Sequence, residues 1–524
     1  MKRLLWLTTL AFSVALAACN GGGGTSVKVP PPTGGFTLAS LKGTYAFSMS
    51  GMDPGNGGTY FVRTGSFVAD GAGNITSALE DVVDLGVALN AGVALTGKYN
   101  VLSNGRGTII LTDTLGDPPL DLTMDLQSSS QGLLVETDGN FASSGSFNLQ
   151  NVNDFLATSI TGNYVFDFSG INLAGTNVTN ISIIGNIAAN GGGSITSGVL
   201  DTNDANNGPS GPQPLTLQGT YTIDPTYGST YGRFSASFAG RNFAFYVVDS
   251  THLKFIEEDA TGSEGTSGDA LVQTGAIPTT NAGLIGSFDY LTGGASTLGA
   301  EASVASFSVT GSGTIGNISY DENNDGANNG DLHISQGTNI SNAIYAIDTT
   351  NAGSGRGTLT FTDTSGTYSY VFYLYSPTSG VIQDISANIV ADGTLLGQSG
   401  SPFTLSGSAG SYVYNWNGVN NSSDNEEDFI GLFTLGTGTT NNITGVLDGT
   451  VIGSGGGNSY ADIGTQGTLT ITSTGTLNNT LQFSGGSALS FKTVVYIVNP
   501  GTMLILDTDT SSVLAGVASV QQTP

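Results

Sequence analysis

Apolar and polar residues alternate along most of this chain, and clusters of Gly, Asn and Asp interrupt the alternation at short intervals. In the clearest case, from Phe67 to Asp81, two alternating segments flank an Asp-Gly-Ala-Gly turn. A period of two residues indicates β-strands, and Gly, Asp and Asn accept positive φ at low cost. We therefore predict a β-hairpin at this stretch.

The hairpin occurs four times in the chain, and other landmarks share its period of about 122 residues. Related stretches begin at Ile187, Phe307 and, more loosely, Phe433. A Gly-x-aromatic sequence opens each unit, and each unit closes on Gln150, Gln273, Gln398 or Gln521. We predict four tandem β-units after a leader and a tether. Their boundaries are 1–18 for a signal peptide, 19–35 for a Gly/Pro-rich tether, and 36–152, 153–277, 278–400 and 401–524 for the repeats.

Each unit contains about eight strand-like segments and no helical period long enough for a crossover connection. The predicted fold class is therefore all-β, with consecutive antiparallel strands. An eight-stranded up-and-down barrel is favoured because closure removes the sheet edges, and a β-sandwich is the alternative. The Gly-x-Tyr opening resembles the Gly-x-Trp opening of lipocalins, and that resemblance implies barrel architecture only.

Two details concern how the units are finished and joined. Phe36 and Phe155 each precede an apolar residue, Leu41 or Ile160, by five positions, which suits a helical turn that plugs one barrel end. The connections between units are short and carry apolar residues, so we expect a semi-rigid rod or compact pairs of units.

Charge narrows the range of partners. Only 10% of residues are charged and the formal net charge is −28, so a phosphate-rich partner or an anionic membrane surface would be repelled. Nucleic acid is therefore not an expected partner.

The N-terminus resembles a bacterial lipoprotein signal. Lys2 and Arg3 precede a short apolar segment, and the sequence Leu-Ala-Ala-Cys ending at Cys19 matches a lipobox. The resemblance implies cleavage before Cys19, acylation of Cys19 by palmitate or a similar chain, and sorting to the outer membrane because Asn20 follows. An ordinary secretory signal with an incidental Cys is the alternative. The Gly- and Pro-rich residues that follow would hold the folded part off the membrane.

Three arginines recur in a chain with few basic residues, namely Arg106, Arg233 and Arg356. A guanidinium suits an anion or carboxylate contact inside or at the mouth of each barrel. The alternative, which we favour, is a structural ion pair with the unit's own acid, such as Asp81, Asp201 or Asp321. Gln466 stands at the matching Gly-x-Gly position of the fourth unit and argues against an obligatory binding role.

One acidic segment resembles the start of an EF-hand loop. Asp321, Asn323 and Asp325 supply oxygens at alternate positions before Gly326, although Leu332 replaces the usual Glu. A structural Ca²⁺ is the only cofactor that the sequence suggests, and solvated polar turns are the alternative.

We find no catalytic motif in the sequence. The two histidines lie in different units, and Glu257 and Glu258 are adjacent, so on a strand they face opposite ways. Tyr368 to Tyr375 are spaced as a barrel wall, which favours core packing over a sugar site.

The sequence therefore predicts a lipid-anchored cell-envelope or surface protein that acts as a multivalent binding module without catalysis. Its partners would be the membrane, through the lipid, and an unknown envelope or extracellular molecule. A carrier with one small apolar ligand per barrel is the first alternative, and a carbohydrate-active enzyme is the second.

Overall fold

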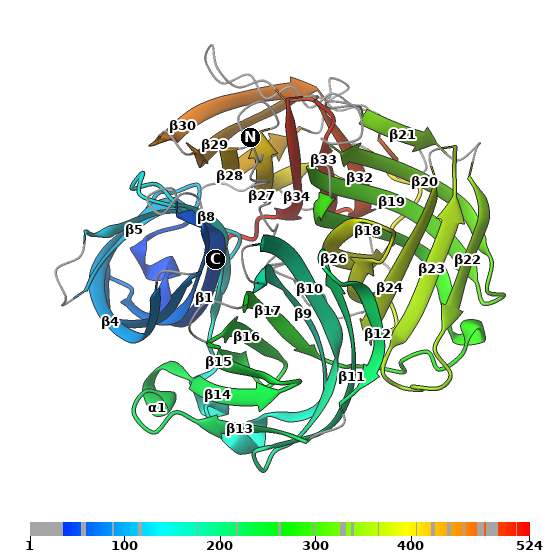
Figure 1. The fold of residues 1–524 in the computed structure, drawn as a ribbon. Helices are drawn as coiled ribbons and strands as arrows, with labels where there is room; N and C mark the ends of the chain where they lie inside the picture. The colour runs from blue at the N-terminus through cyan, green and yellow to red at the C-terminus, as the bar shows by residue number, and fades with distance from the viewer. Residues whose placement is uncertain are drawn as a thin grey trace.

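The structure is a computed structural model. It describes residues 35–524 apart from 54–58, 86–87, 114–117, 175–176, 216–217, 260–263, 297–298, 325–331, 337–339, 365, 405, 421–424, 437–441, 454–455, 469–475, 478–490 and 510. Nearly all regular structure in the described residues is antiparallel strand, arranged in four sheets (Figure 1). The all-β prediction is confirmed.

The first sheet, unit 1, is a closed barrel in which every strand pairs with its neighbour in the sequence. Its strands are β1 (Lys42–Asp53), β2 (Thr59–Asp70), β3 (Asn74–Asp84), β4 (Ala88–Val101), β5 (Arg106–Asp113), β6 (Leu120–Leu126), β7 (Gln131–Glu136) and β8 (Ala142–Leu149). Pairing of β1 with β8 closes it. This is the predicted up-and-down topology.

Unit 2 has the same closed order with one extra strand, because β11 pairs with β10, β12 and β13. Its strands are β9 (Thr161–Ala174), β10 (Asn177–Asn190), β11 (Ser194–Asp204), β12 (Gly208–Pro214), β13 (Gly219–Ile223), β14 (Arg233–Phe238), β15 (Arg241–Asp249), β16 (His252–Glu257) and β17 (Glu264–Val272). A short helix, α1 (Gly228–Tyr231), lies between β13 and β14.

Units 3 and 4 repeat the meander. Unit 3 contains β18 (Ile285–Ser296), β19 (Ala300–Thr310), β20 (Ile315–Asn324), β21 (Leu332–Gln336), β22 (Ser341–Ile347), β23 (Arg356–Thr362), β24 (Thr367–Ser376), β25 (Ser379–Asp384) and β26 (Ile389–Gly397). Unit 4 contains β27 (Gly410–Asn420), β28 (Asn425–Leu435), β29 (Asn442–Gly453), β30 (Gly456–Thr468), β31 (Thr476–Leu477), β32 (Thr493–Asn499), β33 (Thr502–Asp507) and β34 (Ser512–Val520). In each sheet the first strand pairs with the last.

The predicted hairpin from Phe67 to Asp81 is formed by β2 and β3. At its turn, Oδ1 of Asp70 accepts hydrogen bonds from the backbone N–H groups of Ala72 and Asn74. Gly71 and Gly73 have φ of 81° and 99°, a region that favours glycine. The side-chain bonds and the two glycines explain why an Asp/Asn-Gly-x-Gly sequence is repeated.

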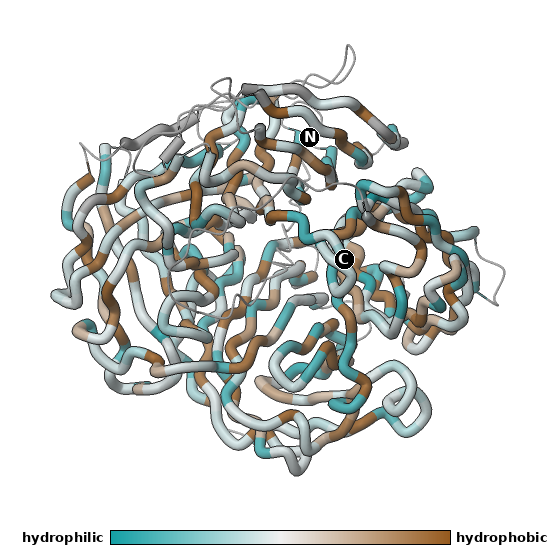
Figure 2. The backbone as a smooth tube through the Cα atoms, turned by 180° about the vertical axis from the view of Figure 1, so that it is seen from behind, coloured by the Kyte–Doolittle hydropathy of each residue, from teal (hydrophilic) through white to brown (hydrophobic). Residues whose placement is uncertain are grey.

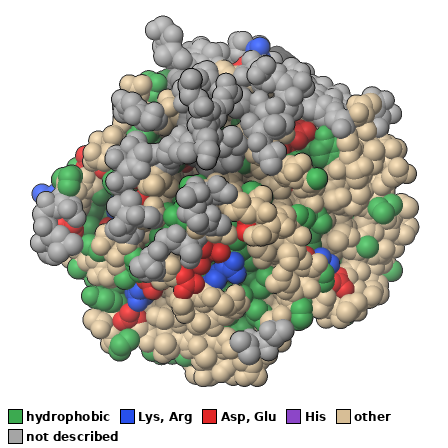
Figure 3. All heavy atoms as spheres, in the orientation of Figure 1, with side chains coloured by type: hydrophobic (Ala, Val, Ile, Leu, Met, Phe, Trp, Pro, Cys, Tyr) green, Lys and Arg blue, Asp and Glu red, His purple; other side chains and the backbone are tan. Residues whose placement is uncertain are grey.

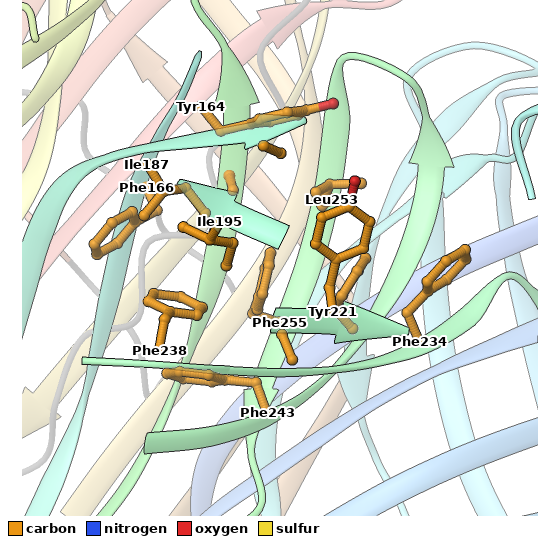
Figure 4. Close-up of a cluster of buried hydrophobic side chains, with 14 of the residues drawn as sticks. Tyr164, Phe166, Ile187, Ile195, Tyr221, Phe234, Phe238, Phe243, Leu253 and Phe255 are labelled. Carbon is orange, nitrogen blue, oxygen red and sulfur yellow. The ribbon is translucent and has the colours of Figure 1, made fainter. Parts of the chain in front are cut away.

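The barrel interiors are filled by side chains. Figure 4 shows Phe166, Phe238, Phe243 and Phe255 of unit 2 converging on one another, and these rings belong to one buried cluster. Similar buried clusters occupy the other three units. Small barrels without a ligand cavity are packed in this way.

A 3-10 turn closes one end of the barrel, as predicted from Phe36 and Leu41. The turn η1 (Leu38–Ser40) precedes β1, and both flanking residues are buried in the core of unit 1. The hydroxyl of Tyr99 donates to the carbonyl oxygens of Leu38 and Leu41 at 2.9 and 2.8 Å. The related turns η4 (Ala157–Ser159) and η5 (Asn281–Gly283) are held by Tyr221 and Tyr345 in the same way.

The four units form a closed ring (Figure 1). The outer face of the second strand of each unit packs on the last strands of the next, and β28 of unit 4 packs on β8 of unit 1. The prediction of a rod or of compact pairs is therefore wrong. One surface binds a different surface of the next copy, and a repeated contact of this kind closes into a ring when its rotation allows.

Burial on both faces at these contacts explains the continuous apolar strands. All residues of β32 except Asn499 are buried, because one face lines the barrel and the other meets unit 3. Where only one face is buried the residues alternate, as in β5. Figure 2 shows apolar and polar segments mixed along the trace.

Candidate functional site at the junctions between units

A glutamine follows the last strand of each unit and bonds the backbone of the next unit in the ring. Nε2 of Gln150 donates to the carbonyl oxygens of Tyr231 and Val247 in unit 2 at 2.9 and 2.7 Å. The equivalent contacts are Gln273 to Ser354 and Leu374, Gln398 to Ile497, and Gln521 to Asn104 and Leu126. The sequence marked these residues as unit boundaries, but it gave no signal that they join one unit to the next.

The repeated arginines pair with acids of the preceding unit. Nε of Arg233, on β14, lies 2.9 Å from Oδ2 of Asp81, on β3 of unit 1, and both side chains are buried. Arg356 binds Asp201 of unit 2 in the same bidentate way, and Arg106 binds Asp448 of unit 4. An ion pair with an acid of the same unit was the favoured interpretation, and Arg233 does bond Asp224 and Glu258 of its own unit, as Arg356 bonds Asp348. The aspartates named from the sequence, however, bond residues of the next unit. The acid faces outward from its barrel, towards the neighbour.

At three junctions a tyrosine of the next unit also bonds the aspartate at this position. The hydroxyl of Tyr246 donates to Asp81 at 2.8 Å, and burial with the adjacent Asp81 raises the pKa of Tyr246 well above its usual value. The equivalent bonds are Tyr373 to Asp201 and Tyr496 to Asp321. These tyrosines stay protonated, so each acts as a hydrogen-bond donor to the carboxylate.

The comparison of Gln466 with the arginines does not hold in the structure. Arg233 and Arg356 lie across from Tyr246 and Tyr373, whereas Tyr496 lies across from Thr476. Gln466 is on β30 and pairs with β29. The short Gly-x-Gly similarity placed it one strand away from the equivalent position.

The junction between units 4 and 1 differs, because Asp125 stands where the other units have tyrosine. It lies across from Arg106, as Tyr246 lies across from Arg233. Asp125 is fully buried, and within the described part of the chain neither carboxyl oxygen accepts a hydrogen bond, although Nε of Arg106 lies 3.9 Å from Oδ1. Burial and the neighbouring Asp448 raise its pKa to about 8, although Arg106 opposes the shift. This carboxyl is therefore largely protonated at neutral pH.

The proposed calcium residues lie at another junction. Asp321 and Asn323 are buried in β20. Nδ2 of Asn323 donates to the carbonyl oxygens of Asp507 and Ser512 in unit 4, at 3.0 and 2.9 Å. Asp325 lies outside the described residues. Among the described residues, no group of three His, Cys, Asp or Glu is arranged to hold a metal ion. The Ca²⁺ remains a prediction, and the two described residues sit in a strand and bind unit 4.

A second acidic feature is the barrel end opposite the 3-10 plug. The seventh strand of unit 1 ends in Glu136, which accepts a 2.6 Å hydrogen bond from Ser143. In unit 2 the equivalent Glu257 accepts from Thr266. Burial raises the pKa of Glu136 to about 8. Burial and the adjacent Glu264 likewise raise the pKa of Glu257. The sequence gave no warning that these acids lie inside the barrels.

An open cavity of about 690 Å³ lies at this end of unit 2. Glu257 points into the barrel towards Thr266, while Glu258 points outward and bonds Arg233. Adjacent residues on a strand do face opposite ways here. The two carboxylates therefore do not face each other as an acid and base pair would.

The clustered tyrosines divide between two environments. Tyr368 and Tyr370 are in the core of unit 3, as predicted. Tyr373 and Tyr375 project from the other face of β24 into the junction with unit 2. Alternation along the strand predicted the first pair but could not reveal a neighbouring barrel behind the second.

Cys19 and the whole leader and tether lie outside the described residues. Among the residues that are described, we find no helix long and apolar enough to cross a bilayer.

No protein-family model matches the chain, and neither does any curated protein. Solved structures of transferrin binding protein B do match, at a distance. The Trp-176-Ala mutant from Haemophilus parasuis Hp5 is 10% identical, with 68% of this chain and 75% of that chain covered and a TM-score of 0.18. The intact Ap-TbpB with N and C lobes is 9% identical, with 95% and 98% covered and a TM-score of 0.18. TM-scores this low carry no argument about function.

Proposed function

We propose that this protein is a lipid-anchored component of the bacterial envelope that acts as a rigid, multivalent binding module without catalysis. The observation that carries the proposal is the repeated junction. The same glutamine, and at three junctions the same arginine and aspartate, hold neighbouring barrels in one closed ring. Because every junction packs the second strand of one unit on the last strands of the next, the corresponding turns of the units are held at fixed spacings.

Fixed spacing favours multivalent contact. Weak contacts made by several equivalent turns add to a strong overall attachment when their geometry is fixed. In three units the middle residue of the hairpin turn is exposed, namely Ala72, Gly192 and Ser312. Figure 3 shows a surface that is mostly uncharged on its described part, with acidic side chains in small groups beside basic ones. Such a surface suits polar contacts rather than one dominant charge interaction.

The filled barrels count against the carrier alternative. The interior of unit 2 is occupied by stacked phenylalanines, such as Phe238 and Phe243 with ring centroids 4.9 Å apart. A ligand inside such a barrel would have to displace core side chains, which costs about 3–5 kcal/mol for each large aromatic.

Site-specific photo-crosslinking in intact cells tests the binding role. A photoreactive residue is placed at Ala72 or at Ser312, and at Ile110 as the control, which is 45% exposed on the wall of unit 1. We expect crosslinks to the same envelope component from both turns and none from Ile110. Absence of crosslinks at both turns, or equal crosslinking at all three positions, would contradict the proposal.

Anchoring is tested separately. The Cys19→Ser protein should lose its acyl label and leave the membrane fraction, and globomycin should block processing of the wild type. If the Cys19→Ser protein still partitioned with membranes, the proposed lipid anchor would be refuted. The binding role would then still be tested by crosslinking.

A further inference from the structure

The connection before the repeated arginine differs in length among the units. In unit 2 it spans residues 224–232, between β13 and β14, and contains α1. In unit 3 it spans 348–355, and in unit 1 only 102–105. Each of these connections lies at a junction, because the closing glutamine of the preceding unit bonds it at Tyr231, Ser354 or Asn104.

At the junction between units 1 and 2 the long connection fills the space between barrels. Tyr227 and Tyr231 pack against a buried cluster that includes Ala46 and Leu79 of unit 1. The ring of Tyr227 also lies close to Gly92, where an added Cβ would come within 2.9 Å of it. Two aromatic side chains thus cover this part of the unit 1 wall.

At the junction between units 4 and 1 the connection is short, and the described residues do not fill this space. A cavity of about 560 Å³ lies there, between Asn104 of unit 1 and the wall formed by β28 and β29. Its volume is within the range of small-molecule sites, about 300–1,000 Å³.

The register shows that the two places are equivalent. In unit 1 Ser66 pairs with Leu79, and in unit 4 Leu432 pairs with Val446. Ser66 and Leu432 each come one residue before the core phenylalanine of their strand, Phe67 or Phe433. Leu79 is fully buried beneath the tyrosines, whereas Val446 is half-buried and lines the cavity.

The lining sets the chemistry of an occupant. Leu432 and Val446 give an apolar wall, and Ser411, Thr434 and Gln521 bring hydroxyl and amide groups. No charged side chain is among the lining residues described. Such a surface suits an uncharged aromatic ring that carries a hydroxyl, and the same molecule places tyrosine side chains in the equivalent space of another junction.

We infer that the cavity between units 4 and 1 is a binding site for a phenolic ring, supplied by a free phenolic compound or by a tyrosine side chain of a peptide. The site does not depend on the proposed envelope role, because it is formed by the way in which the four barrels pack together.

Calorimetric titration of the full-length protein tests the inference with two probes. The probe p-cresol presents the ring alone, and N-acetyl-tyrosinamide presents it on a peptide backbone. We expect saturable binding of at least one probe, and preference between them distinguishes the two sources. Failure of both probes to bind at millimolar concentration would overturn the inference.

The variant Thr444→Trp places a large ring at the mouth of the cavity, from a residue that is exposed and lines it. Thr108→Trp is the matched control, because Thr108 is exposed on β5 and does not line the cavity. We expect Thr444→Trp to weaken binding by about tenfold or more, equivalent to about 1.4 kcal/mol, and Thr108→Trp to leave it unchanged. Equal affinities in both variants would place the probe elsewhere.

A loop exchange gives an independent readout. Replacing residues 102–105 by the sequence of 224–232 should bring tyrosines into the cavity, raise the melting temperature and abolish probe binding. A graft that folds and binds the probe as the wild type does would contradict the inference.

Discussion

A buried guanidinium holds two barrels together at three junctions of the ring. Arg233 meets Asp81 of unit 1 and also bonds Asp224 and Glu258 of its own unit. A buried ion pair adds little net stability over apolar residues, but loss of one partner strands the other charge. The arginine therefore matters most as the partner that makes a buried aspartate tolerable.

Arg233→Met should destabilise the protein by about 3–5 kcal/mol, because it leaves Asp81 buried without its counter-charge. Urea denaturation measures the loss. Lys492→Met is the control, since Lys492 is 61% exposed beside Asp509 and such pairs contribute about 0–1 kcal/mol. The double variant Arg233→Met/Asp81→Leu should recover part of the lost stability. An Arg233→Met protein as stable as the Lys492→Met control would contradict this role.

At the scale of the element, the hairpin turn combines a side-chain cap with two glycines. Gly73 has φ of 99°. Its carbonyl oxygen accepts a hydrogen bond from the N–H of Tyr99, which lies on the next strand of the barrel, β4. The same pattern joins Gly193 to Tyr221 and Gly313 to Tyr345. The turn thus sets the register between the hairpin and the tyrosine that holds the 3-10 plug.

Gly73→Ala should therefore destabilise unit 1 by about 1 kcal/mol or more. An added Cβ meets no atom closer than 3.4 Å, so the cost comes from positive φ and not from a clash. Ala72→Ser, at the exposed neighbour in the same turn, should change stability by less than about 0.5 kcal/mol. Hydrogen exchange of β3 and β4 checks both variants, and equal protection in the two would refute the strain argument.

The elements of one unit were predictable because their causes are local. Turn glycines, alternation and the spacing from Phe36 to Leu41 predicted the hairpin, the barrel and the plug. The partner of Arg233 was not predictable, since Asp81 lies in another unit and a repeat period says nothing of the rotation between copies. Asp125 illustrates the same limit, because in sequence it is one acid among many and only the closed ring buries it.

At the scale of the whole molecule, folding buries many carboxyls that a formal charge of −28 counts as ionised. Burial raises the pKa of Asp125 and Glu136 to about 8 and that of Asp289 and Glu427 to about 7. Asp269 is the opposite case: burial opposes its ionisation, but Lys254 and His252 lower its pKa to about 2. The folded ring therefore carries less negative charge at neutral pH than the sequence suggests.

The protein should be more stable at pH 5 than at pH 8.5. Between about pH 4 and 8 the folded state keeps protons on the four raised carboxyls that the unfolded state has released, so stability falls as pH rises through this window, by up to about 1.4 kcal/mol per group and pH unit. Below about pH 4 Asp269 acts in the other direction. Melting temperatures at constant ionic strength check this, and a higher value at pH 8.5 would reverse the sign.

Asp125→Asn locates one part of this pH dependence at the junction between units 4 and 1. At pH 5 the carboxyl is protonated, so the amide should leave the melting temperature nearly unchanged. At pH 8.5 the wild type must bury an ionised Asp125 beside Asp448 with Arg106 shared between them, so the variant should be the more stable and exchange of β5 and β6 should slow. Asp289→Asn should flatten the pH profile without changing exchange in β5 and β6, because Asp289 lies in unit 3. If both variants slowed exchange in β5 and β6 equally, the effect would be one of total charge. The junction between units 4 and 1 would then not be the pH-sensitive one.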